Sequence, residues 1–181
     1  MYEQLKTPRA LAFVTALALS VVGACSRPMD ADAKTLARER AAAFMAQDQY
    51  KQARAALEPL LAEKQVPLED WVRAAVLEYA DGNYDAFETR LTAARALAPD
   101  APQVLYLEGQ FLKEQGQFAA ARANFERVLK TVPQDLPNRL ALGEVCDELG
   151  DVATAEAQYR AVVGVGIENG QLWYCSAVYR L

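Results

Sequence analysis

The chain of 181 residues contains no histidine. This absence excludes the most common general base, the most common protein metal ligand and every Ser–His or Cys–His catalytic pair. The run Gly164-Val165-Gly166 has no preceding strand and no following lysine, so it does not match a phosphate-binding loop. The sequence therefore predicts a protein that is not an enzyme and that binds no metal or cofactor.

Basic residues are also scarce, because 19 Lys and Arg face 24 Asp and Glu and the formal net charge is −5. Nucleic-acid binding depends on clustered basic side chains that neutralise phosphates, and the body of the chain has no such cluster. We therefore predict no nucleic-acid partner. Glycine and proline are few and widely spaced, which argues against an internal linker or a low-complexity segment.

Only one long apolar run is present, LAFVTALALSVV at 11–22, and it follows Lys6 and Arg9. Twelve helical residues rise about 18 Å, well short of the roughly 30 Å hydrocarbon core of a bilayer. A basic start followed by a short apolar segment is typical of a signal peptide rather than of a membrane span.

The residues that follow this run are Val22, Gly23, Ala24 and Cys25, and they resemble the lipobox of bacterial lipoproteins. The resemblance implies cleavage after residue 24 and lipidation (palmitate) of Cys25, with 25–33 as a short tether. Ser26, where retention at the inner membrane usually requires Asp, implies an outer-membrane lipoprotein that faces the periplasm. The alternative is a general secretory signal in which the cysteine lies near the cut by chance.

The rest of the chain is a repeat of regular length. Gly116 aligns with Gly82 and Gly150, and Pro133 aligns with Pro99. A period of about 34 residues is typical of arrays of antiparallel helix pairs. We therefore predict an all-α solenoid whose units are 34–67, 68–101, 102–135 and 136–169, with 170–181 as the first helix of an incomplete fifth unit or a cap.

The unit resembles the tetratricopeptide repeat. The residues that match its pattern are Trp71, Tyr84, Ala94 and Pro99 in the second unit, Gly109, Phe118, Ala121, Phe125 and Pro133 in the third, and Leu142, Gly143, Ala155 and Tyr159 in the fourth. The first unit is weakest, with Tyr50 and Ala53 in register and Asp48 at the turn-glycine position.

Specific packing follows from this register. Gly109 and Gly143 are expected to lie against Ala121 and Ala155, respectively, where small side chains let two helices approach closely. The turn glycines are expected to end each first helix in the left-handed conformation. The fillers between units are predicted to be Phe118, Phe125, Tyr159 and Leu97. Departures from the repeat are Phe87 at an alanine position, which predicts a local shift, and Pro59 inside a helix.

In the superhelix that the resemblance implies, the first helices form a concave inner face that holds extended peptides or a partner's helix. We predict the binding groove there, apolar and aromatic in the middle and acidic toward the C-terminal end; aromatic side chains at helical spacing more often form core, and this stays the alternative. By register the face contains Arg38, Met45, Val72, Val76, Tyr79, Tyr106, Gln110, Lys113, Leu140, Glu144, Asp147 and Tyr174.

Three functions remain open. The main hypothesis is a scaffold that binds another envelope protein, attached to the membrane through the lipid on Cys25. The first alternative is a pilotin-like assembly factor for an envelope machine such as a pilus or a secretion system. The second is the N-terminal module of a larger, enzymatic protein, since the apolar segment with Leu172 and Trp173 is not followed by a second helix. This segment also predicts self-association.

Two cysteines remain after Cys25. Parallel stacking of successive first helices separates Cys146 from Cys175 by more than the roughly 7 Å between Cα atoms that a disulfide spans. We therefore predict two buried thiols rather than a bridge.

Overall fold

The computed structural model describes residues 29–165 and residue 180, and it confirms the all-α solenoid. The described part contains helices and no strand. The helices are α2 (Ala31–Met45), α3 (Tyr50–Leu61), α4 (Leu68–Ala80), α5 (Tyr84–Leu97), α6 (Pro102–Glu114), α7 (Phe118–Thr131), α8 (Leu136–Glu148) and α9 (Val152–Val165).

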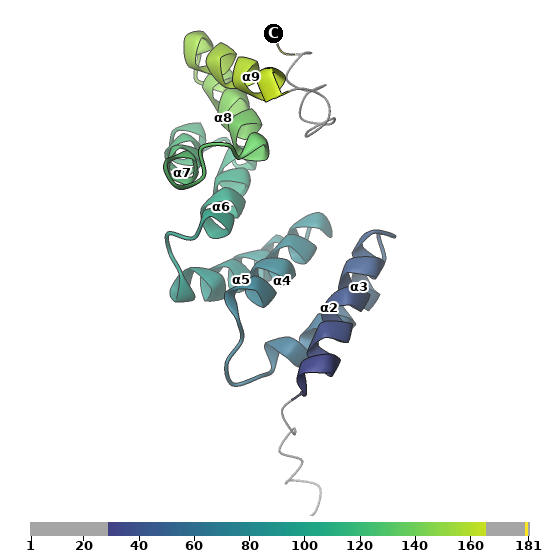
Figure 1. The fold of residues 1–181 in the computed structure, drawn as a ribbon. Helices are drawn as coiled ribbons and strands as arrows, with labels where there is room; N and C mark the ends of the chain where they lie inside the picture. The colour runs from purple at the N-terminus through teal and green to yellow at the C-terminus, as the bar shows by residue number, and fades with distance from the viewer. Residues whose placement is uncertain (1–28, 166–179, 181) are drawn as a thin grey trace, which may run out of the picture.

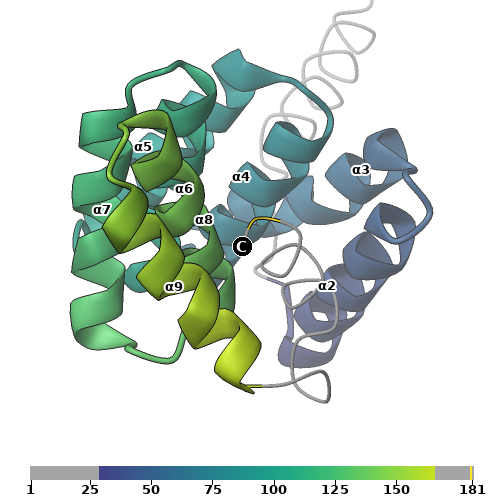
Figure 2. The same ribbon diagram turned by 90° about the horizontal axis from the view of Figure 1, so that it is seen from above.

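The helices form four antiparallel pairs that stack in chain order (Figure 1). From α4 onward the predicted period holds at both helices of each pair. The first helices α4, α6 and α8 begin at Leu68, Pro102 and Leu136, and the second helices α5, α7 and α9 begin at Tyr84, Phe118 and Val152. Viewed from above, the pairs follow a curve, with α2, α4, α6 and α8 on its inner side and α3, α5 and α7 on its outer side (Figure 2).

Left-handed residues end the first helix of each pair, as predicted. Gly82, Gly116 and Gly150 have φ of 72°, 72° and 74°. Asp48 holds the same place in the first pair with φ of 55°, a conformation that a side chain tolerates less well. The chain therefore reverses in the same way at each of the four turns.

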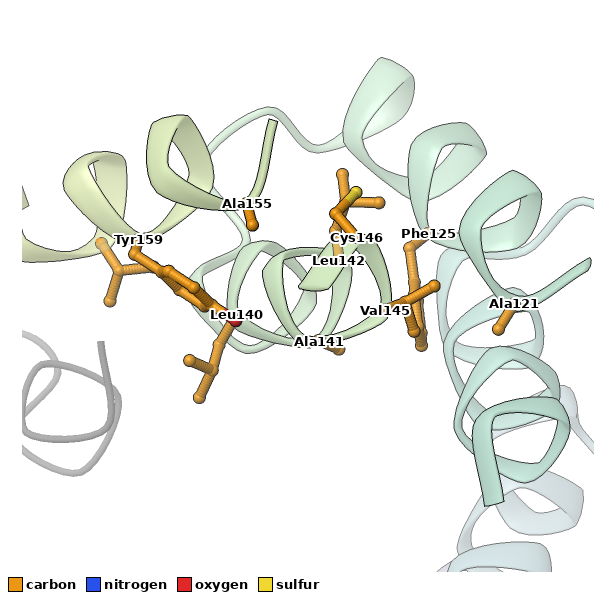
Figure 3. Packing of buried hydrophobic residues seen from close by; sticks show 10 residues of the cluster. Ala121, Phe125, Leu140, Ala141, Leu142, Val145, Cys146, Ala155 and Tyr159 are labelled. Atoms are coloured by element: carbon orange, nitrogen blue, oxygen red, sulfur yellow. The ribbon is translucent and has the colours of Figure 1, made fainter. Parts of the chain in front are cut away.

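Each glycine inside a first helix lies against an aromatic ring rather than against the predicted alanine. A Cβ atom on Gly109 would come within 2.5 Å of Cε1 of Phe125. A Cβ atom on Gly143 would come within 2.8 Å of Cδ1 and Cζ of Tyr159. Figure 3 shows Tyr159 reaching toward α8, with Ala155 on the same helix. The small residue makes room for the ring that fills the space between the two helices.

The structure also tests the predictions for the tether, Leu97, Phe87 and Pro59. Helix α2 begins at Ala31, capped by Asp30, so helix already occupies the last three residues of the predicted tether. Leu97 is 56% exposed and fills no joint, which corrects its predicted role, because it is the last residue of α5. Phe87 is fully buried in an unbroken α5, where its ring lies 5.0 Å from that of Phe111 in the next pair. Pro59 lies inside α3.

Joints between neighbouring pairs differ in chemistry. At the first joint, Arg54 of α3 donates to both carboxylate oxygens of buried Glu78 on α4, at 3.0 Å from Nε to Oε1 and 2.7 Å from Nη2 to Oε2. At the last joint, Phe125 of α7 and Val145 of α8 are both fully buried in one apolar cluster (Figure 3). The buried ion pair is thus added at the first joint to an apolar cluster that includes Leu57 of α3 and Leu77 of α4.

Several predicted features lie outside the described residues: the signal peptide, Cys25, Tyr174, Cys175 and the segment 170–181 apart from Arg180. Of the two cysteines in question, Cys146 is described, and its thiol is free and buried. No helix in the described part is both long enough and apolar enough to span a bilayer.

Candidate functional site

The candidate site is the inner face formed by the first helices α2, α4, α6 and α8. Helices α4, α6 and α8 lie side by side, since α4 contacts α6 and α6 contacts α8, and α2 meets α4 through the ion pair of Arg38 with Asp70. On each helix, residues three or four apart project to the same side, so Val72, Val76 and Tyr79 share one face of α4. The repeat places the equivalent residues of α6 and α8 beside them.

Helix α4 contributes the apolar part of this face. Val72 is half-buried and Val76 is 37% exposed. Tyr79 packs its ring 5.3 Å from that of Phe87 and donates its hydroxyl to Glu114 of α6. Burial and this hydrogen bond raise the pKa of Tyr79, so the phenol stays protonated at neutral pH.

Helix α6 contributes a tyrosine whose ring is mostly covered. The Tyr106 ring lies 6.0 Å from that of Phe125, and its hydroxyl accepts a hydrogen bond of 2.8 Å from Nε2 of Gln110. Burial raises the pKa of Tyr106. The hydroxyl and the amide of Gln110 are the parts of this pair that a partner could contact by hydrogen bonding.

Helix α8 contributes the predicted acidic end, and its carboxylates are already paired. Glu144 accepts from Nζ of Lys113 at 2.7 Å and from Nη2 of Arg180 at 3.2 Å. Asp147 accepts a 2.5 Å hydrogen bond from the hydroxyl of Tyr159. The hydrogen bond of Tyr79 with Glu114 joins α4 to α6, and the ion pair of Lys113 with Glu144 joins α6 to α8. These polar contacts stabilise the spacing of the inner helices.

One hollow opens beside the predicted groove residues. It encloses about 250 Å³ and is lined by Leu68, Glu69, Val72, Arg73 and Gln103, so it lies at the N-terminal ends of α4 and α6. Among the predicted groove residues, Val72 alone lines it. A ligand in this hollow would meet apolar and charged side chains together.

The structure separates the predicted groove residues into two groups. Val72, Val76, Tyr79, Tyr106, Gln110 and Glu144 retain exposed surface. Leu140 is 7% exposed and belongs to the core, which corrects its placement on an open groove. The leucine packs inward because it shares a cluster with Tyr159 and Val145.

Sequence reasoning missed two buried carboxylates near this face. Asp70 is 1% exposed and receives Nε and Nη2 of Arg38 at 2.8 and 2.6 Å, with Nη1 of Arg73 at 3.1 Å. Glu78 is the second. The signal was available, because both residues stand one period after apolar ones, Leu36 and Phe44, and a charge at a repeated core position requires a partner.

No group of three or more Cys, Asp or Glu side chains in the described ranges is arranged to hold a metal ion. No curated protein is detectably similar to this chain in sequence. Solved structures are similar in fold. PilW, described as a widely conserved type IV pilus biogenesis factor, superposes with a TM-score of 0.69 at 21% identity, over 82% of this chain and 66% of that one. This chain thus spans slightly less than two thirds of PilW.

Two further structures show the same architecture. Pseudomonas aeruginosa PilF superposes with a TM-score of 0.68 at 16% identity, over 82% of this chain and 69% of that one. MamA from Desulfovibrio magneticus RS-1 superposes with a TM-score of 0.62 at 18% identity, over 82% of this chain and 86% of that one. At these identities the likeness is one of fold.

Sequence profiles identify the family directly. Two profiles described as tetratricopeptide repeat match residues 72–135 and 112–164, which together span just over half of the chain. The matched ranges run from α4 to α9, where the repeat is regular. The chain belongs to the tetratricopeptide repeat proteins.

Proposed function

We propose that this protein is a lipid-anchored scaffold of the bacterial envelope that holds a segment of another envelope protein on its inner face. Tetratricopeptide repeat proteins bind protein partners, and proteins of this fold are typically scaffolds rather than enzymes. Attachment through lipidated Cys25, at the periplasmic side of the outer membrane, is part of the proposal, and the lipobox supports it.

The observation that carries the proposal is the exposed apolar surface on an otherwise paired inner face. Polar side chains there satisfy each other across helices, as Tyr79 does with Glu114 and Lys113 with Glu144. Val76 stands among them and keeps 37% of its surface in water. A partner segment that covers Val72 and Val76 removes apolar surface from water without breaking those pairs.

Crosslinking in living cells tests the inner face. A photoreactive amino acid at Val76 is expected to give one dominant adduct with an envelope protein, identified by mass spectrometry. Val152 is the matched control, because it is also an exposed valine but begins the outer helix α9. Equal adducts from both positions would mean that the inner face is not the binding surface.

The anchor is tested separately with Cys25→Ala. This variant is expected to lose labelling by a fatty-acid probe, to accumulate unprocessed precursor and to leave the outer-membrane fraction. Processing to the wild-type mature size together with retained lipid label would refute the lipoprotein part of the proposal. It would leave the scaffold part standing, because the crosslinks report on that part alone.

A second candidate function is assembly of a pilus or a related envelope machine, and the fold likeness to PilW favours it. Deletion of the gene is expected to reduce surface pili in a piliated strain, and wild-type protein is expected to restore them. The variant Val76→Glu should fail to restore pili while accumulating to wild-type levels. Unchanged piliation in the deletion strain would leave the general scaffold as the function.

A further inference from the structure

The first helix pair carries an apolar groove that none of the predicted inner-face residues lines. A hollow of about 570 Å³ lies between α2 and α3, and its lining includes Met29, Leu36, Arg40, Phe44 and Pro59. Leu36 is 46% exposed at its edge. Helices α2 and α3 form the N-terminal end of the array of helix pairs (Figure 1).

The repeat itself shows that this surface is built to be covered. Residues one, two and three periods after Leu36 are Asp70, Val104 and Asn138, which are 1%, 0% and 0% exposed. The position of Phe44 is less uniform in its burial. Phe44 and Leu112, two periods later, are half-buried, whereas Glu78 and Cys146, one and three periods later, are buried. The side chain at the position of Leu36 is therefore buried in the three later units, each of which follows another helix pair, and it is exposed only in the first pair.

In the later pairs, the buried residues at these positions contact a helix of the preceding pair. Asn138 donates through Nδ2 to the carbonyl oxygen of Phe125 on α7 at 2.8 Å. Glu78 accepts from Arg54 of α3. Asn138 and Glu78, which are equivalent to Leu36 and Phe44, thus contact the second helix of the preceding pair. At the N-terminal end no described helix holds that place.

We propose that an amphipathic helix of a partner protein docks in this groove, in the place that α3, α5 and α7 hold against the pairs that follow them. Those helices show what the groove accepts. Each presents buried residues at i, i+4 and i+7, namely Ala53, Leu57 and Leu60, then Phe87, Leu91 and Ala94, then Ala121, Phe125 and Val128. The partner helix carries the same spacing of apolar residues.

Arg40 adds a requirement for charge. Its side chain is exposed at the groove, and no carboxylate in the described part of the chain lies within ion-pair distance of it. A docked helix that places Glu or Asp beside this guanidinium gains a charge-assisted hydrogen bond. The partner helix is therefore acidic on one flank of its apolar stripe.

A second copy of this protein does not fit as the occupant. The equivalent helix at the other end of the array is α9, and its residues at i, i+4 and i+7 are Ala155, Tyr159 and Val162. Each is only 1% exposed within its own chain. Helix α9 thus has no apolar stripe of this spacing left to offer.

A synthetic helical peptide tests the proposal with the full-length protein. The peptide carries leucines at i, i+4 and i+7, one flanking glutamate and a benzophenone next to the stripe, and a peptide of the same composition in scrambled order is its control. Crosslinks mapped by mass spectrometry are expected in α2 and α3. The variant Leu36→Glu should lower the yield about tenfold or more, because it buries a carboxylate among apolar groups.

Matched variants make the result specific. Leu97→Glu alters another exposed leucine outside the groove and is expected to leave the yield unchanged. Arg40→Glu should weaken capture, and a peptide with lysine in place of its glutamate should restore it. Crosslinks elsewhere in the chain, an equal yield with the scrambled peptide, or no effect of Leu36→Glu would overturn the proposal.

One further measurement covers the case of no crosslink at all. In that case Leu36→Cys is treated with maleimide and the labelled peptide is identified by mass spectrometry. An unreactive thiol would mean that the chain's own N-terminal segment or another copy covers the groove, and light scattering tells these apart. Either result, or a reactive thiol without peptide capture, counts against a partner's helix.

Discussion

The backbone of Gly143 lies directly against the ring of Tyr159, with no space between them for a methyl group. Tyr159 cannot move away easily, because it is 1% exposed and its hydroxyl is held by Asp147. The contact joins the two helices of the fourth pair, so it sets how closely α8 and α9 approach each other.

Gly143→Ala is therefore expected to destabilise the protein by about 1 to 3 kcal/mol, since the new methyl overpacks a buried contact. Thermal or urea unfolding followed by circular dichroism measures the change. Gly164→Ala is the control: it lies in helix α9 with no atom within 4 Å of the added Cβ. This control should be neutral or stabilising by up to about 1 kcal/mol. A Gly143→Ala protein as stable as the wild type would contradict the packing.

Arg54→Ala should destabilise the first joint by about 2 to 4 kcal/mol, because it leaves the buried carboxylate of Glu78 without its cation. The arginine is 30% exposed, so water partly replaces it and the cost stays below that of a fully buried pair. Urea unfolding measures the loss, and Arg54→Met with Glu78→Met should recover part of it. The exposed pair of Arg160 with Glu156 is the control, where Arg160→Ala should cost less than about 0.5 kcal/mol.

Acid should remove the contribution of Asp151 to the stability of the folded protein. Hydrogen bonds from Thr154, with Arg122 at 2.9 Å, lower the pKa of Asp151 in the folded protein. Its contribution is therefore complete above the ordinary aspartate pKa of about 3.9 and is lost as pH falls through the lowered folded value. We expect Asp151→Asn to lower Tm at pH 7 and the gap from wild type to close toward pH 2. A gap that is constant with pH would contradict the ion pairing.

Cys146 is expected to resist alkylation in the native protein. Its thiol is buried, and burial raises its pKa, so little thiolate is accessible at pH 8. Iodoacetamide labelling, quantified by mass spectrometry of the peptide that contains Cys146, should be at least about a hundredfold slower in buffer than in urea. Fast labelling without denaturant would show that the last joint opens readily.

Much of the fold could be predicted, because the repeat depends on backbone requirements that few residues meet. The left-handed turns at Gly82, Gly116 and Gly150 favour glycine, and Asp48 could be placed at the fourth turn by register alone. The burial of Leu140 could not be predicted from the same register. A helix position that faces the inner side can still turn its side chain into the neighbouring core, and spacing does not distinguish the two cases.

The contacts between particular side chains could not be predicted from the sequence either. Ala155 and Tyr159 are one helical turn apart, so the register could not decide which of the two side chains lies against Gly143, and the structure shows that it is Tyr159. The pairs of Tyr79 with Glu114 and of Lys113 with Glu144 depend on the lateral offset of neighbouring helices. That offset follows from the packing of whole pairs, and no single spacing in the sequence carries it.

The unlike joints make the order of the helix pairs specific. Arg54 faces Glu78 across the first joint, and the residue that holds the place of Arg54 in the second unit is Glu88. If the unit 68–101 were duplicated in tandem, Glu88 of one copy would face Glu78 of the next, and two carboxylates would share a buried place. Duplication of this unit therefore requires a compensating substitution in the neighbouring unit. Each unit is specific to its position in the array.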